Sequence, residues 1–219
     1  MNEWPPIAFA HLLAGTLAVS AGMAAMLLPK GARMHRLCGR VFATCMLLLC
    51  ASGIYLSVTR SILFTLFLSV LALNAVLSGW AAASRAADWQ RTAAHVGLVL
   101  ICGNALAAAD GGMAAAASDS GVIDGLPAAA FLTVASLSAL LGLLDRAWIR
   151  RTQRPPRQRT ARHLSRMGFA MFIATAIFFF GNSSVLPVGL RSVPLLVAPV
   201  AAVMVLTLGW LAFVLLSGP

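Results

Sequence analysis

The chain has 219 residues, of which 60% are hydrophobic and only 10% are charged, and its mean hydropathy is +0.90. Soluble domains average roughly 45–50% apolar and about 25% charged residues, so this composition excludes a water-soluble fold, which would lack the polar surface to cover its core. The formal net charge of +10 would suggest nucleic-acid binding in a soluble protein. Here the basic residues lie between apolar segments, where they meet anionic lipid headgroups, and we expect no nucleic-acid partner.

Seven apolar segments follow one another, each of about 18–24 residues, which is long enough to cross ~30 Å of hydrocarbon as a helix. Backbone polar groups cannot stay unpaired in lipid, so these segments are predicted to be helical. The predicted fold class is all-α, a polytopic transmembrane bundle of about seven helices that forms a single domain over 1–219. The expected spans are 7–28, 41–58, 61–83, 92–110, 126–145, 164–186 and 194–217.

The first segment and the connection after it carry two local patterns. His11, Gly15, Ala18 and Gly22 lie on one helical face, and small residues on such a face predict the close approach of another helix. The connection 29–40 begins with a helix-breaking Pro-Lys-Gly turn and is expected to be a cationic loop. Its basic residues could clamp a lipid phosphate or another anionic ligand, or serve only as a surface anchor; they are Lys30, Arg33, Arg36 and Arg40.

The basic residues predict the orientation of the chain. The connections 29–40, 84–91 and 146–163, together with Arg166, hold all but two of the 16 Lys and Arg residues, and the alternate connections hold most of the acids. Because basic connections stay in the cytoplasm, the N-terminus is predicted to lie outside and the C-terminus in the cytoplasm. The segment 111–125 is expected to be a flexible outer loop, and 150–162 a basic linker on the membrane surface.

Polar residues within the spans are functional candidates because they are costly in lipid. Asn74 and Asn104 are predicted to lie in mid-membrane, and Asn182 at the outer end of the sixth span. The histidines are the candidate ligands for a metal of undefined identity or for a haem, and they are His11, His35, His95 and His163. Alternatively, each histidine only donates a hydrogen bond to a backbone carbonyl or a headgroup phosphate.

A bis-histidine haem needs two imidazoles at matched depth on facing helices. On the cytoplasmic side His95 could pair with His35 or with His163, whereas His11 stands alone on the outer side. At most one b-type haem therefore fits the sequence. A zinc-hydrolase site on the last span is not favoured, since 194–217 contains neither histidine nor acid.

Two motifs carry a resemblance to a known family. The first is His11-x-x-x-Gly15 followed by Pro29-Lys30-Gly31-x-Arg33-x-His35-Arg36-x-x-Gly39-Arg40, and the second is Arg162-His163-Leu164-x-Arg166-Met167 with Phe178-Phe179-Phe180-Gly181 and Leu186-Pro187 beyond it. The chain resembles bacterial membrane proteins grouped as domain of unknown function 2306 or their close relatives. The resemblance implies a polytopic protein of the bacterial inner membrane, without an established activity. It includes His11, His35 and His163 in its motifs but not His95.

Three functions stay open at this point. The favoured one is a non-catalytic membrane protein that binds anionic lipid, another membrane subunit or a second copy of itself. The second is an electron carrier with one histidine-liganded haem or with quinone. The third is a path for a small solute or proton marked by Asn74, Asn104 and His11. An enzyme is the less favoured class.

Overall fold

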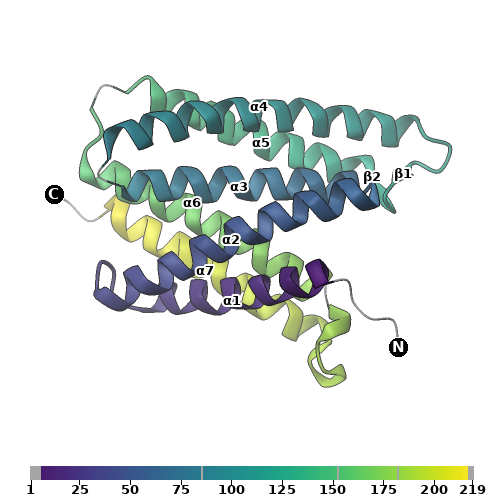
Figure 1. The fold of residues 1–219 in the computed structure, drawn as a ribbon, viewed down its shortest axis with the longest axis horizontal. Coiled ribbons are helices and arrows are strands. Elements are labelled where there is room, and N and C mark those ends of the chain that lie inside the picture. The colour runs from purple at the N-terminus through teal and green to yellow at the C-terminus, as the bar shows by residue number, and fades with distance from the viewer. Residues whose placement is uncertain (1–5, 85, 152, 182, 217–219) are drawn as a thin grey trace. The chain divides into compact units, whose positions relative to one another are not determined.

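The computed structural model describes residues 6–84, 86–151, 153–181 and 183–216 (Figure 1). Within these ranges, seven helices are long and apolar enough to cross a membrane. They are α1 (Pro6–Leu27), α2 (Arg33–Arg60), α3 (Leu63–Ala83), α4 (Ala87–Ala117), α5 (Ala128–Ile149), α6 (Pro156–Ala176) and α7 (Val193–Leu216). The predicted all-α fold of seven potential spans is thereby confirmed.

The chain forms two compact units. The first unit comprises Met1–Leu49 and Pro155–Pro219, and so contains α1, the first part of α2, α6 and α7. The second unit comprises Cys50–Arg154 and contains the rest of α2, α3, α4 and α5. The expectation of one domain over the whole chain stays a prediction.

In the first unit, small residues let the helices approach closely. The face of α1 predicted to pack against another helix is buried at Gly15, Ala18 and Gly22. A Cβ atom added to Gly22 would lie 2.5 Å from the Sδ atom of Met171 in α6 and 2.9 Å from the ring of Phe42 in α2. Close packing of this kind holds helices together in lipid, where the hydrophobic effect does not.

Beyond α6 the backbone of the first unit changes its helical form. The residues Ile177–Gly181 form a π-helical turn, and two short 3-10 turns follow at Ser183–Val185 and Val188–Leu190 before α7 begins. The sixth span was expected to continue as one helix to residue 186, so its predicted end is wrong. The Phe178–Phe180 run and the proline that follows it mark this irregular segment.

In the second unit, α3, α4 and α5 pack around an aromatic group at one end. The ring centroid of Phe131 in α5 lies 5.5 Å from that of Phe64 and 6.3 Å from that of Phe67, both in α3, and the ring planes of both pairs are close to perpendicular. Gly111 of α4 lies against the same rings, since a Cβ atom there would be 3.2 Å from both Phe131 and Phe67. These contacts pack α4 closely against α3 and α5 at this end of the unit.

A short β-hairpin joins α4 to α5, where a flexible loop was expected. The strands β1 (Val122–Ile123) and β2 (Leu126–Pro127) pair antiparallel around Asp124 and Gly125, whose φ angles are +54° and +71°. Asp-Gly is a preferred sequence for a two-residue turn with both φ angles positive. The Asp124 carboxylate also accepts a hydrogen bond of 2.9 Å from the backbone N–H of Phe64, at the start of α3. The predicted flexible loop over 111–125 is therefore wrong, since α4 itself continues to Ala117.

Two basic segments expected as connections are helical. The helix α2 begins at Arg33 rather than at residue 41, and α6 begins at Pro156 rather than at residue 164. Arginine is a good helix former, and proline is tolerated at the first helical position. The apolar pattern marks only the part of a helix that lies in lipid, so it missed these polar first turns.

Candidate functional site

Lys30 is exposed, and its ammonium contacts both the end of α1 and a side chain of α7. Its Nζ atom donates hydrogen bonds to the carbonyl oxygens of Ala25 at 3.2 Å, of Leu28 at 3.4 Å and of Met26. The ammonium also lies 4.5 Å from the centroid of the Trp210 ring in α7. Partial burial lowers the pKa of Lys30. A cation at the last carbonyls of a helix stabilises its C-terminus, so Lys30 caps α1.

Two other residues of this segment also bond to nearby backbone. The Nδ1 atom of His35 lies 2.9 Å from the carbonyl oxygen of Ala25, the same oxygen that accepts from Lys30. The guanidinium of Arg36 donates to the carbonyl oxygen of Gly31. For His35, this contact has the form of the backbone hydrogen bond expected of a histidine without a ligand. Lys30, His35 and Arg36 thus stabilise the turn from α1 to α2.

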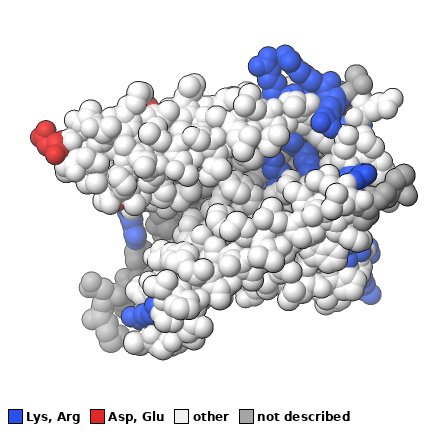
Figure 2. Space-filling model, turned by 180° about the vertical axis from the view of Figure 1, so that it is seen from behind, with Lys and Arg blue, Asp and Glu red and all other residues white. Residues whose placement is uncertain are grey.

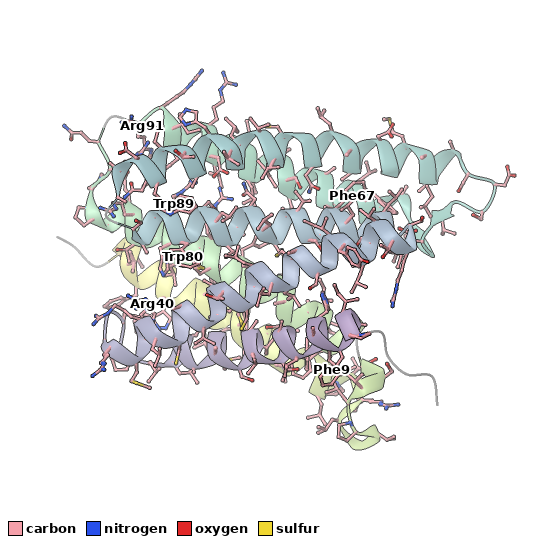
Figure 3. The ribbon with its side chains drawn as sticks, in the orientation of Figure 1. Phe9, Arg40, Phe67, Trp80, Trp89 and Arg91 are labelled. Atoms are coloured by element: carbon pink, nitrogen blue, oxygen red, sulfur yellow. The ribbon has the colours of Figure 1, made fainter. Side chains whose placement is uncertain are left out.

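Arg33 and Arg40 are exposed, as Lys30 and Arg36 also are, and they share one face of α2. Seven residues separate them, which places both on one face of a helix with 3.6 residues per turn. Leu37, which is 53% exposed, lies between them on that face, and Leu48, which is 59% exposed, continues the face further along the helix. Figure 3 shows Arg40 near the start of α2. Their side chains are available to a ligand outside the protein.

Most basic residues of the first unit gather at one end of its helices, whereas Arg191 lies just before α7 and donates to the carbonyl oxygens of Leu186 and Ser184. Arg157, at the start of α6, donates from Nε to the carbonyl oxygen of Val214 at 2.8 Å, and Lys30 covers Trp210 in the same terminal part of α7. The end of α1, the start of α2, the start of α6 and the end of α7 therefore lie together. We define the basic end of the first unit by Lys30, Arg33, Arg36, Arg40, Arg157, Arg159 and Arg162.

The second unit carries most of its basic residues at one end of α4 and α5, an end that also includes Asp88 and the buried Asp145. Its basic end comprises Arg91, Arg146, Arg150, Arg151 and Arg154. Arg154 lies 5.0 Å from the Trp148 ring and donates to the Trp148 carbonyl oxygen at 3.3 Å, so it packs against the end of α5. The opposite end, at the hairpin, carries Asp119 and Asp124. Figure 2 shows basic atoms at one end of this part of the surface, acidic atoms at the other and uncharged surface between them.

Asn74 belongs to a buried polar group that connects α3, α4 and α5. Its Nδ2 atom donates to the carbonyl oxygen of Gly97 at 2.9 Å and to Oδ2 of Asp145 at 3.3 Å. Asn74 and Asp145 both have no exposed surface. Gly97 permits this approach, because a Cβ atom there would lie only 3.0 Å from the amide nitrogen of Asn74.

Asp145 is a buried functional candidate that the sequence analysis missed. The fifth span was expected to end at Asp145, which would leave the carboxylate at the membrane surface. In the structure α5 continues to Ile149, so Asp145 lies inside the helix with 0% exposure. The available signal was the apolar Ala147-Trp148-Ile149 sequence just beyond it. Arg166, counted among the cytoplasmic basic residues, is also buried, in α6.

Asn104 forms a second helix-to-helix link. Its Nδ2 atom donates to Oγ of Ser138 in α5 at 2.9 Å and to the carbonyl oxygen of Phe67 in α3 at 3.2 Å. The amides of Asn74 and Asn104 are thus both engaged in packing within the second unit. This removes the main observation behind a solute path, which required these amides to line an open polar cavity.

The remaining histidines are divided between the two units. His95 is exposed in the second unit, and its Nδ1 atom lies 2.8 Å from the carbonyl oxygen of Arg91, one turn earlier in α4. His11 and His163 are half-buried in the first unit. Over the described ranges, no group of three or more His, Cys, Asp or Glu residues could hold a metal ion. Asn182 lies outside the described residues.

A haem ligand among these histidines stays a prediction. A ligating histidine commonly uses one ring nitrogen for iron and the other to donate to a carbonyl, which fixes its ring orientation. The Nδ1 contacts of His35 and His95 have this form and direct Nε2 away from the carbonyl. These contacts therefore fit both a packing role and an axial ligand.

Comparisons with known proteins add no family: no family model, no curated protein and no solved structure matches the chain. The resemblance to domain of unknown function 2306 stays a prediction. The class of this protein is inferred from its seven apolar helices and from the charges at their ends. The chain is an integral, multi-pass membrane protein.

Proposed function

We propose that this protein is a non-catalytic membrane protein that binds anionic lipid headgroups through the basic ends of its two units. The proposal includes the orientation, with the N-terminus outside and the C-terminus in the cytoplasm, and the location, the inner membrane of a bacterium. The observation that carries it is the separation of charge along α4 and α5, with arginines at one end and Asp119 and Asp124 at the other.

An anionic leaflet attracts a Lys or Arg near its surface by about 1 kcal/mol, and the attraction falls off within a Debye length. Each basic end has several such residues, of which Arg33, Arg40, Arg146 and Arg150 are exposed. The same distribution favours the basic ends on the cytoplasmic side, because positively charged connections are retained there.

Cysteine labelling tests the orientation. In a background without the four native cysteines, we expect an impermeant maleimide to label Asp119→Cys in intact cells. The same reagent should label Arg150→Cys only after the cells are opened, since both positions are exposed in the structure and differ in the end that they occupy. Labelling of Arg150→Cys in intact cells would contradict the orientation.

Lipid enrichment tests the function. In nanodiscs of mixed phosphatidylglycerol and phosphatidylcholine, we expect the first lipid shell to be enriched about twofold or more in phosphatidylglycerol, and the enrichment to fall at high salt. Combined substitution of Arg91, Arg146 and Arg150 by Gln should reduce it. Arg60→Gln, an exposed residue at the opposite end of the second unit, is the control and should leave it unchanged. A wild-type shell with the bulk composition would overturn the proposal.

A further inference from the structure

The basic end of the first unit contains cations of two kinds. Lys30, Arg36 and Arg157 are engaged with carbonyl oxygens of the protein itself. Arg33 and Arg40 are exposed on α2, seven residues apart. The first kind stabilises helix ends through contacts with the protein's own backbone, and the second kind lies exposed on one face of α2.

The exposed face of α2 continues from these arginines into apolar surface. Exposed positions recur at Leu37, Thr44 and Leu48, which share the face with Arg33 and Arg40 at helical spacing. The opposite side of the helix is buried at Phe42, Ala43 and Met46. One face thus offers two guanidinium groups at its basic end and an apolar strip along the rest of its length.

This combination matches the chemistry of a phospholipid. Arg33 and Arg40 are separated by roughly 10 Å along the helix axis. A long arginine side chain near a helix end turns toward the headgroup region, so the deeper Arg40 and the outer Arg33 can approach the same phosphate. Guanidinium groups bind phosphate oxygens in pairs, and acyl chains pack on exposed leucine side chains.

We propose that this face of α2 binds one anionic phospholipid, with its phosphate held by Arg33 and Arg40 and an acyl chain lying along Leu37, Thr44 and Leu48. This inference rests on the proposed function and makes it specific, because it assigns the tightest lipid to one helix face rather than to diffuse positive charge. Lys30 and His35 act only by holding the start of α2 against the end of α1.

Native mass spectrometry of the delipidated protein with added phosphatidylglycerol tests the assignment. We expect one lipid to remain bound at collision energies that remove the others. The double variant Arg33→Gln/Arg40→Gln should weaken this binding about tenfold or more. The matched double variant Arg146→Gln/Arg150→Gln removes the same charge from exposed positions of the second unit and should change it less than about threefold. Both variants alter exposed residues, so their thermal unfolding midpoints should equal that of the wild type.

Two further arms identify the ligand as a lipid. Leu37→Gln keeps both charges and should still weaken binding, because the acyl chain loses its apolar contact. Glycerophosphoglycerol, which is the headgroup without acyl chains, should not displace the bound lipid; displacement would assign the face to a soluble phosphate compound and overturn the proposal. Equal losses in the two double variants would overturn the α2 site while leaving the proposed function intact. A wild-type protein with no preference for anionic over zwitterionic lipid would overturn both.

Discussion

The Gly168→Ala variant is expected to be strongly destabilised, by about 2–3 kcal/mol, although it adds only one methyl group. A Cβ atom at position 168 of α6 would overlap the side chain of Thr207 in α7, with Oγ1 at 2.5 Å and Cβ at 3.0 Å. Thr207 cannot easily turn away, since its hydroxyl donates to the carbonyl oxygen of Val203 at 2.7 Å. The helices α6 and α7 must therefore separate, and thermal unfolding of the purified protein in detergent would measure the loss.

The controls for this result lie on the same helix pair. Gly209→Ala in α7 should leave the unfolding midpoint nearly unchanged, because nothing lies within 4 Å of a Cβ atom there. Thr207→Ala should restore part of the stability lost in Gly168→Ala. It removes Oγ1 and Cγ2 of Thr207, which are two of the three atoms that the added methyl group would overlap, and leaves only Cβ. Similar midpoints for Gly168→Ala and Gly209→Ala would show that α6 and α7 are not packed this closely.

The second large effect is expected for Asn74→Leu. This change removes the donor that serves both the carbonyl oxygen of Gly97 and the carboxylate of Asp145. Removing one hydrogen-bond donor from a buried acceptor costs about 1–3 kcal/mol, and more when the acceptor is charged, so we expect a loss of about 2–3 kcal/mol. Unfolding by increasing mole fractions of a denaturing detergent would measure it.

Asn104→Leu is the matched comparison, because it replaces the same residue type in the same three-helix group. It removes the amide that donates to the neutral Ser138 hydroxyl and to the carbonyl oxygen of Phe67, and no carboxylate is involved. Hydrogen bonds between membrane helices average about 0.6 kcal/mol in double-mutant cycles, so the expected loss is about 1 kcal/mol. An Asn104→Leu loss equal to or greater than that of Asn74→Leu would contradict the special role of the Asp145 carboxylate.

The spans could be predicted because the bilayer imposes a length and a composition on each of them. The end of α3 at Ala83 and the start of α7 at Val193 agree with the expected spans to within one residue. Helix ends outside the hydrocarbon obey local rules instead. Arg33 continues α2 and Pro156 starts α6, although neither position is apolar.

The candidate site was only partly predictable. The sequence placed Lys30, Arg33, Arg36 and Arg40 in one basic segment, but it treated them as equivalent. In the structure these residues differ in their contacts. Lys30 donates to the carbonyl oxygens at the end of α1, whereas Arg33 and Arg40 lie on the exposed face of α2. Such contacts depend on the angle at which the chain leaves α1, which periodicity does not encode.

Long-range polar contacts were beyond the sequence for a related reason. The bond from the Phe64 N–H to Asp124 joins residues 60 positions apart, and the bond from Asn74 to Asp145 joins residues 71 positions apart. Each requires the packing of three helices to be known first. The Asp124-Gly125 turn was the exception, because its two residues signal a tight hairpin by themselves.

The two-residue turn between α4 and α5 constrains how the second unit can move. Its register pairs Val122 with Pro127 and Ile123 with Leu126, and β2 is followed directly by α5 at Ala128. The Asp124 carboxylate accepts from the backbone of Phe64 at the start of α3. A displacement of this end of α5 would therefore move the start of α3 with it, whereas residues 118–121 give α4 a longer connection to the hairpin.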